Sequence, residues 1–430
     1  MTKVAYYCLA VLVVALLGSC SRSAPGDANA EFATRTPSAN DQTVAISQAA
    51  VRGASDQDFL ARAPRVAAAR MRRLAARASA TAAGILPDPM LDVLYMRMPM
   101  DSEYGAGGMI MLEQTFPRWG ERDGMRAMAA ADLAMADADL AMVRGEILSR
   151  LTMYQAQARG AQAKANAYSE NAKRAENFAE LIAKSAAATG GARLAEVLAL
   201  HSRAQAMEVA AHEAQIAATD ALGRGRALLG LSVTATVPDP GSPAAALIDL
   251  TRNPRLRLAQ AAALQAQAQF AIAASRSRPE VGVRAGWQRE GRDAFDEYRV
   301  GVSIAIPVHP SAWRGPEEAA LRRHDAAQLD AAGVNAEAEE LLARVSRAQE
   351  QALRARTVAD DTKKRLGLEL ENVSSGVATA EPGSIAMVFE RLDMLADTEV
   401  MAAMAEAEAA MAGAELWMLM PIPDAVAERP

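Results

Sequence analysis

Methionine is the residue type whose clustering bears most directly on chemistry. The chain of 430 residues contains 21 Met, and one short segment holds Met90, Met96, Met98, Met100, Met109 and Met111. A thioether sulfur is a soft ligand that suits ions such as Cu(I). Met also serves as a flexible apolar filler in place of Leu. Contact with a soft metal ion in transit is therefore one interpretation, and ordinary packing is the one that the sequence favours.

The other residues that bind metals or catalyse reactions show no such grouping. His201 and His212 lie about three helical turns apart, so about 16 Å of helix axis separates them, too far for one metal ion. The sequence contains no P-loop, dinucleotide fingerprint, nucleophile elbow or zinc-ligand spacing. We therefore expect no enzyme activity, no cofactor and no resident metal. A secreted enzyme, the alternative, would need a polar cluster that the sequence lacks.

The composition favours long packed helices. Aromatic residues make up only 4% of the chain, although ordinary cores rely on them for bulk. Abundant Ala favours helix formation, and Met can fill the gaps between packed helices. The net charge of −6 and the absence of long blocks of like charge argue against nucleic-acid binding.

The N-terminus has the pattern of a secretory signal. A basic residue precedes an apolar run over residues 4–17, which is too short for a comfortable transmembrane helix. Leu-Gly-Ser-Cys at residues 17–20 resembles a bacterial lipobox, in which the cysteine thiol is acylated. We therefore expect a lipoprotein signal peptide over 1–19, lipidation of Cys20 and a flexible tether over 20–42. An ordinary signal peptide with an incidental cysteine is the alternative.

Landmarks recur along the chain at an offset of about 190 residues. They are Ala63-Pro64-Arg65-Val66 with Asn253-Pro254-Arg255-Leu256, Leu86-Pro87-Asp88 with Arg278-Pro279-Glu280, Thr115-Phe116-Pro117 with Ala305-Ile306-Pro307, and Leu194-Ala195-Glu196-Val197-Leu198 with Ile385-Ala386-Met387-Val388-Phe389. Matches in the same order at one offset indicate a tandem duplication. We expect repeats over 43–235 and 251–420, a linker over 236–250 and a disordered tail over 421–430.

Each repeat contains a segment with the alternation of a β-hairpin, at about 90–117 and 280–307. In the second, large apolar residues alternate with small or charged ones on both sides of a charged turn. Such alternation over about ten residues is typical of a transmembrane strand, although a soluble half-buried hairpin shows it too. The residues expected to line the inner, polar face are Arg284, Gln288, Arg299 and Ser303.

The first hairpin alternates less cleanly than the second. Leu94, Met96 and Met98 fall on the face that Asp92 assigns to the interior. The prediction of strands that cross a membrane therefore depends more on the second hairpin than on the first.

A very long helix is predicted after each hairpin. Residues 120–185 contain no Pro, and one apolar position recurs every seven residues at Leu133, Leu140, Ile147, Tyr154, Ala161, Tyr168 and Ala175. A sustained seven-residue seam indicates helices packed side by side along their length. Some 65 residues would span about 100 Å, and residues 316–374 repeat the feature. We therefore expect a mostly α fold with long antiparallel helical hairpins and a small β part.

Four strands are too few to close a barrel, so the chain is expected to oligomerise. An open sheet edge in lipid leaves unpaired backbone groups, each costing several kcal/mol. About eight strands are the minimum closed set. The twelve or so strands of three chains would enclose a channel.

These features resemble the TolC-like outer-membrane efflux proteins. The resemblance covers about residues 45–420, and its motifs are Gly191 to Leu198 with Leu228-Leu229-Gly230, Gln114-Thr115-Phe116-Pro117-Arg118-Trp119-Gly120, and Asn253-Pro254 with Pro279-Glu280 and Ile304-Ala305-Ile306-Pro307. It is nearest to the lipoprotein branch that serves tripartite resistance-nodulation-division pumps, including heavy-metal-type members. It implies a homotrimer, lipid-anchored in the outer membrane and extending into the periplasm. A β-barrel and an α-helical barrel would passively conduct drugs or metal ions from an inner-membrane pump and a periplasmic adaptor.

The resemblance also implies that the tips of the helical hairpins contact the adaptor and gate the tube. The corresponding residues are Gly190, Gly191, Arg193, Leu194 and Glu196 in the first repeat, and Gly383, Ser384 and Ile385 in the second. The second repeat departs from the pattern through the inserted Glu381-Pro382. Simple helix capping by Gly is an alternative role for the glycines. A structural periplasmic lipoprotein with helical hairpins and no pore is the alternative for the whole chain, but it would not need the strand pattern.

Overall fold

The computed structural model describes residues 58–99, 104–189, 194–241, 243, 248–289, 296–309, 311–378 and 384–422. The expected signal peptide, Cys20 and the tether lie outside these ranges. Residues 423–430 of the expected tail and five residues of the expected linker do so too. For Ser384 and Ile385, only the backbone is described.

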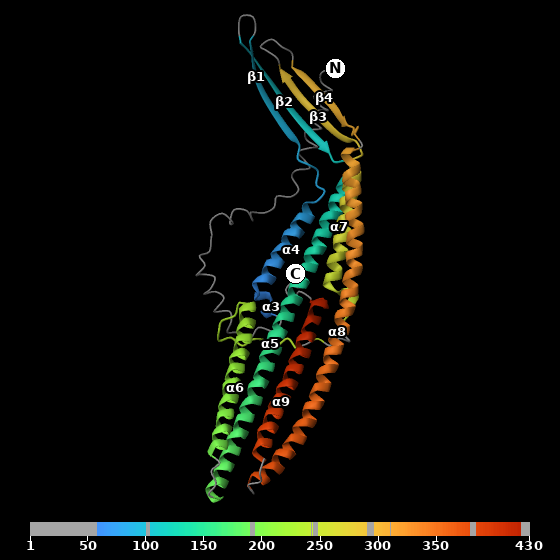
Figure 1. The fold of residues 1–430 in the computed structure, drawn as a ribbon. Helices are drawn as coiled ribbons and strands as arrows, with labels where there is room; N and C mark the ends of the chain where they lie inside the picture. Colours follow the sequence, from blue (N-terminus) through green and yellow to red (C-terminus); the bar gives the residue numbers. More distant parts are fainter. Residues whose placement is uncertain are drawn as a thin grey trace. The chain divides into compact units, whose positions relative to one another are not determined.

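The two halves of the chain contain the same series of elements (Figure 1). The first half contains α4 (Pro64–Ala82), β1 (Met90–Pro99), β2 (Tyr104–Phe116), α5 (Glu121–Thr189) and α6 (Leu194–Leu229). The second contains α7 (Pro254–Ser275), β3 (Glu280–Arg289), β4 (Glu297–Ala305), α8 (Ser311–Ala378) and α9 (Ser384–Ala414). Three short helices accompany them: α3 (Asp58–Arg62), η2 (Leu250–Arg252) and η3 (Glu415–Leu419). The predicted mostly helical fold with an internal repeat and four strands is confirmed.

Local chemistry sets the start of the first helix in each repeat. Pro64 and Pro254 occupy the first turn of α4 and α7, where a missing backbone N–H costs no helical hydrogen bond. The side chain of Asn253 accepts a hydrogen bond from the backbone N–H of Arg255 and so caps α7. Ala63 provides no side-chain cap for α4. The two repeats therefore share the proline but differ in the cap.

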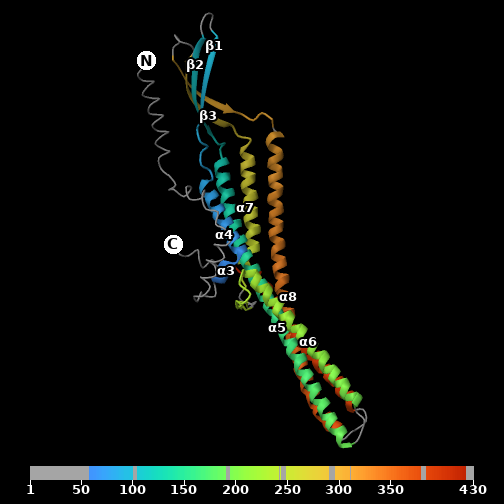
Figure 2. The same cartoon turned by 90° about the vertical axis from the view of Figure 1, so that its left-hand side faces the viewer.

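Helix α5 packs against more neighbours than any other described helix. It contacts α4, α6, α7 and α9, and both views show α6 and α9 running beside it (Figure 1, Figure 2). The predicted seam is buried at Leu140, Ile147 and Ala175. Burial also extends to Leu151 and Ala158, because neighbours approach α5 from several sides. Among the described residues, no helix combines the length and apolar character needed to cross a membrane.

One apolar cluster ties the two helical hairpins together. It includes Ile182 of α5, Leu200 of α6, and Val388 and Leu392 of α9, all fully buried. Burying an aliphatic side chain of this size contributes about 1.5–3 kcal/mol. A second cluster lies around Val66, where α4 packs on α5. The repeats are therefore held together along the long helices as well as through the sheet.

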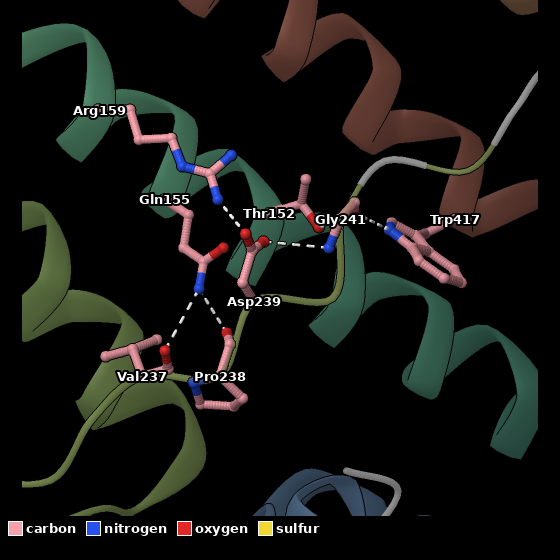
Figure 3. Close-up of polar contacts among 8 residues, drawn as sticks. All are labelled: Thr152, Gln155, Arg159, Val237, Pro238, Asp239, Gly241 and Trp417. Carbon is pink, nitrogen blue, oxygen red and sulfur yellow. Dashed lines mark hydrogen bonds and ion pairs between the residues drawn. The ribbon is translucent and has the colours of Figure 1, made fainter. Parts of the chain in front are cut away.

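The segment between the two repeats is anchored on α5 (Figure 3). Gln155 donates a hydrogen bond to the carbonyl of Pro238, and the Thr152 hydroxyl donates to the carbonyl of Gly241 at 3.1 Å. The indole N–H of Trp417 donates to the same Gly241 oxygen at 3.1 Å. These side chains satisfy carbonyl groups that belong to no helix or strand. The expected linker is thus packed against the helices where the structure describes it.

The four strands form one antiparallel sheet in the order β1-β2-β3-β4. The hairpins of the two repeats join through β2 and β3, where Glu113 lies opposite Arg284 and Met111 opposite Gly286. Strands β1 and β4 are the edges. Only a few residues connect strands and helices, so the sheet lies where α4 and α7 end and α5 and α8 begin (Figure 1).

Candidate functional site

The sheet has one face that is apolar across all four strands. Its large exposed members are Leu91, Val93, Tyr95, Ile110, Tyr298, Val300, Val302 and Ile304. Val281, Val283 and Trp287 of β3 lie on the same face. A contiguous exposed apolar surface of this extent marks contact with lipid or with another protein.

The residues predicted to line the inner face lie together on the opposite side of the sheet. In the register of β3 and β4, Arg284 lies opposite Gly301 and Ser303 lies opposite Gly282. Gln288 and Arg299 occupy positions of the same parity. A Cβ atom at Gly282 would come within 2.6 Å of the Ser303 hydroxyl oxygen. The small residues on this face therefore make room for the polar ones.

Ion pairs balance the charges of the polar face. Arg284 pairs with Glu113 of β2 at 2.8 Å, which links the two repeats. Arg299 pairs with Glu297 of its own strand at 3.0 Å. A shallow groove of about 200 Å³ runs beside Arg284 and Arg299, next to Met111. A surface of paired charges is polar without a strong excess of either sign, which suits conduction better than tight binding.

Three of the clustered methionines, Met90, Met109 and Met111, lie on this polar face rather than on the apolar one. Met90 lies opposite Glu113, and Met111 lies opposite Asp92. Met109 lies opposite Gln288 and belongs to the same face. Only the backbones of Met96 and Met98 are described, and Met100 lies outside the described residues. The less regular alternation of the first hairpin therefore reflects apolar residues on the polar face, such as Leu94 opposite Met109, and does not reflect a reversed strand.

The structure describes part of the predicted hairpin tips. Gly190, Gly191, Arg193 and Gly383 lie outside the described residues, and the backbone of Ser384 and Ile385 begins α9. At the start of α6, Leu194 exposes 70% of its surface and Glu196 is half-buried. Near the end of α5, a hydrogen bond from Lys184 lowers the pKa of Glu180. The described tip residues thus include one prominent exposed apolar side chain.

Polar contacts between the repeats went undetected by sequence reasoning. Arg203 of α6 donates a hydrogen bond from Nε to Asp393 of α9 at 2.8 Å. Glu399 of α9 accepts a hydrogen bond from the buried Asn171 of α5 at 3.1 Å. Lys363 of α8 pairs with the same carboxylate at 2.7 Å. The first two contacts join the two repeats and the third joins α8 to α9, so no pattern within a single element predicts them.

The histidines are separate in the structure. His201 is exposed, whereas His212 lies in a polar groove between α5 and α6 with Asn166 and Glu208. In the part of the chain that the structure describes, no three His, Cys, Asp or Glu side chains come together as a metal site.

Comparisons with known proteins give a consistent likeness of fold. No family model matches the chain, and no curated protein matches its sequence. The outer membrane protein VceC of Vibrio cholerae matches with a TM-score of 0.72 and 18% identity, over 84% of this chain and 94% of that chain. The outer-membrane channel OprN matches with a TM-score of 0.70 and 18% identity, over 85% and 88%. The Neisseria gonorrhoeae MtrE outer membrane channel, in its open state, matches with a TM-score of 0.64 and 17% identity, over 84% and 86%. The chain therefore has the fold of solved outer-membrane channels over most of its length.

Proposed function

We propose that this chain is the outer-membrane export duct of a tripartite efflux system and passively conducts drugs or metal ions to the exterior. The observation that carries the proposal is the two-faced sheet, with an exposed apolar face and a polar face holding Arg284, Gln288, Arg299 and Ser303. A transmembrane barrel needs an apolar band outside and a polar interior. The likeness of fold to solved outer-membrane channels supports the proposal.

The open edges of the sheet argue that the duct is a homotrimer. Strands β1 and β4 each have one edge without a neighbour in the described structure. In lipid such an edge must be paired, because no water can satisfy its backbone groups. Joining β4 of one chain to β1 of the next would close about twelve strands around a channel.

The long helices would continue the duct beyond the membrane. Leu329, Leu353 and Leu368 are exposed along α8, and Leu198 and Val209 are exposed along α6. Exposed apolar side chains on a helix favour packing against further helices. Neighbouring chains would cover these side chains and complete an α-helical barrel.

The remaining parts of the proposal concern partners and anchoring. The hairpin tips, with the exposed Leu194 and the start of α9, would contact a periplasmic adaptor that couples the duct to an inner-membrane resistance-nodulation-division pump. The lipobox-like sequence ending at Cys20 supports a lipid anchor in the outer membrane. No residue is assigned a catalytic role.

Conductance in planar bilayers tests the proposal, together with the mass of the purified oligomer. We expect a trimeric mass and stable single-channel steps. A monomeric protein without channels would overturn the duct and favour the lipoprotein without a pore.

A further inference from the structure

A cavity of about 440 Å³ lies where the sheet meets the first turns of α5. Its apolar wall includes Leu86, Phe116 and Val281, and its polar wall includes Arg118, Arg122 and Arg126. Phe116 and Val281 face each other across β2 and β3. Both belong to the apolar face of the sheet. The cavity therefore lies where the surface that the proposed duct presents to lipid ends, next to the helices.

An exposed tryptophan marks the same border. Trp119 lines the cavity and exposes 74% of its surface. Tryptophan side chains concentrate at the boundary between the hydrocarbon core and the lipid headgroups, because the ring is apolar while its N–H needs a polar partner. In the proposed duct, the position of Trp119 places Arg118, Arg122 and Arg126 at the depth of the lipid headgroups.

Two of the arginines retain donor groups for a ligand. Arg118 forms an ion pair with Glu280 at 2.9 Å. Arg122 donates from Nε to the carbonyl of Gly84 at 2.9 Å, and its terminal amino groups bind no other group among the described residues. Arg126 approaches only Asp123, at 3.8 Å with side-chain exposures of 56% and 85%, and water screens such a pair strongly.

The backbone holds Arg122 and Arg126 side by side. They lie one helical turn apart on α5, so their side chains project from the same face. Gly84 adopts a φ of 70°, and a Cβ atom there would come within 2.9 Å of Cγ of Arg126. The absence of a side chain at Gly84 thus leaves room for Arg126 next to Arg122.

We propose that this cavity binds the headgroup phosphate of a membrane phospholipid, with Arg122 and Arg126 as donors. The site rests on the proposed function, because it needs the sheet to lie in a bilayer. Guanidinium groups form short, charge-assisted hydrogen bonds to phosphate oxygens. Phe116 and Val281 would contact the start of an acyl chain, and Trp119 would cover the headgroup. The bound lipid would fix the depth of the barrel in the membrane.

The second repeat does not reproduce this site. At the offset of 190 residues, Val308 and Ala312 stand where the first repeat has Arg118 and Arg122. Arg314, near the start of α8, stacks on Trp313 at 5.4 Å from the ring centroid. Each chain therefore has this site in the first repeat only, and Arg314 provides a matched control.

Calorimetric titration of the full chain in detergent micelles tests the site, with dihexanoyl-phosphatidylglycerol as the probe. We expect saturable binding that is about tenfold weaker in the double variant Arg122→Gln with Arg126→Gln, because two charge-assisted contacts are lost. Arg314→Gln should bind like the unmodified chain. Arg126→Gln alone keeps the Arg122 bond to Gly84 and should weaken binding several-fold, which covers the case in which the double variant misfolds.

Two further titrations identify the source of the phosphate. Inorganic phosphate and dihexanoylglycerol should both bind far more weakly than the phospholipid. Equal affinity for inorganic phosphate, or unchanged affinity in both arginine variants, would overturn the proposal. Conductance of the same preparations separates the lipid site from the duct. If channels form but the lipid does not bind, the site alone is refuted. If the lipid binds but no channels form, the duct alone is refuted.

Discussion

Helix α5 of the first repeat and helix α8 of the second have nearly the same length but very different surroundings. Helix α5 buries side chains on several sides, against α4, α6, α7 and α9. Helix α8 buries essentially one seam, whose members recur every seven residues: Ala338, Val345, Ala352, Ala359 and Leu366. Large apolar residues of α8, such as Leu353 and Leu368, remain exposed.

The difference shows how a duplicated unit builds an asymmetric subunit. The first long helix lies in the interior of the single chain, so other helices of that chain cover its apolar side chains. The second long helix leaves large apolar side chains uncovered within the single chain. The duplication thus supplies one long helix that is buried within the chain and one that keeps large apolar side chains exposed.

The two β-hairpins differ in a related way. The polar face of the second hairpin alternates charged residues with Gly, as at Arg284 and Gly286. The polar face of the first hairpin is rich in Met, with Asp92 and Glu113 between them. The hairpins share their outward, apolar chemistry and differ in what they would present to the interior.

The largest expected effect separates the two faces of the first hairpin. Val93 and Leu94 are adjacent, apolar and both exposed, at 68% and 44%, but they lie on opposite faces. We expect Val93→Arg to prevent insertion and trimer formation, because a lipid-facing Arg costs about 2–4 kcal/mol in each chain. Leu94→Arg should still yield trimers, with altered ion selectivity in planar bilayers. Equal tolerance of the two variants would contradict the assignment of faces.

The next effect tests whether the repeats share one core. Leu200 of α6 and Leu392 of α9 are both fully buried in the cluster that joins the hairpins. Replacing either with Ala should lower the free energy of unfolding by about 2–5 kcal/mol. The double variant should show non-additivity, because residues that share one packed cluster couple through it. Leu368→Ala, at an exposed position of α8, is the control for the monomer in denaturant titrations.

A smaller effect concerns the helix cap that only the second repeat possesses. Asn253→Ala removes the side-chain acceptor for the Arg255 N–H and should cost about 1 kcal/mol. Asn253→Ser keeps an acceptor and should retain most of the stability. Denaturant midpoints of the three proteins provide the measurement, and equal loss in both variants would show that packing around Asn253, rather than its cap, is responsible.

The smallest effect on stability is expected at the ion pair between α6 and α9. Arg203 and Asp393 are partly exposed, at 46% and 39%, so the pair contributes about 0.2–1 kcal/mol. Arg203→Asp places two carboxylates together and should loosen the tip ends of the hairpins, raising the open probability in bilayers. The exchange Arg203→Asp with Asp393→Arg should restore the original gating. If the open probability of the exchanged protein does not return to the original value, the pair does not restrain the tips.

Much of the fold follows from patterns within single segments. The prolines at Pro64 and Pro254 predict where the opening helices begin, and the seven-residue recurrence from Leu133 to Ala175 predicts α5. Alternation in the second hairpin places Arg284, Gln288, Arg299 and Ser303 on one face, and the structure gives all four that placement. Their contact with a channel interior stays a prediction.

The pairing of distant elements required the tertiary structure. Sequence patterns did not show that β2 joins β3, that Glu113 pairs with Arg284, or that Arg203 pairs with Asp393. Sequence patterns did not show the arginine-lined cavity either, because Gly84, Arg122 and Val281 come from three separate segments. Periodicity reports which face of an element is apolar, because helix and strand geometry repeat locally. It carries no information on which other element covers that face, and that choice depends on packing across the whole chain.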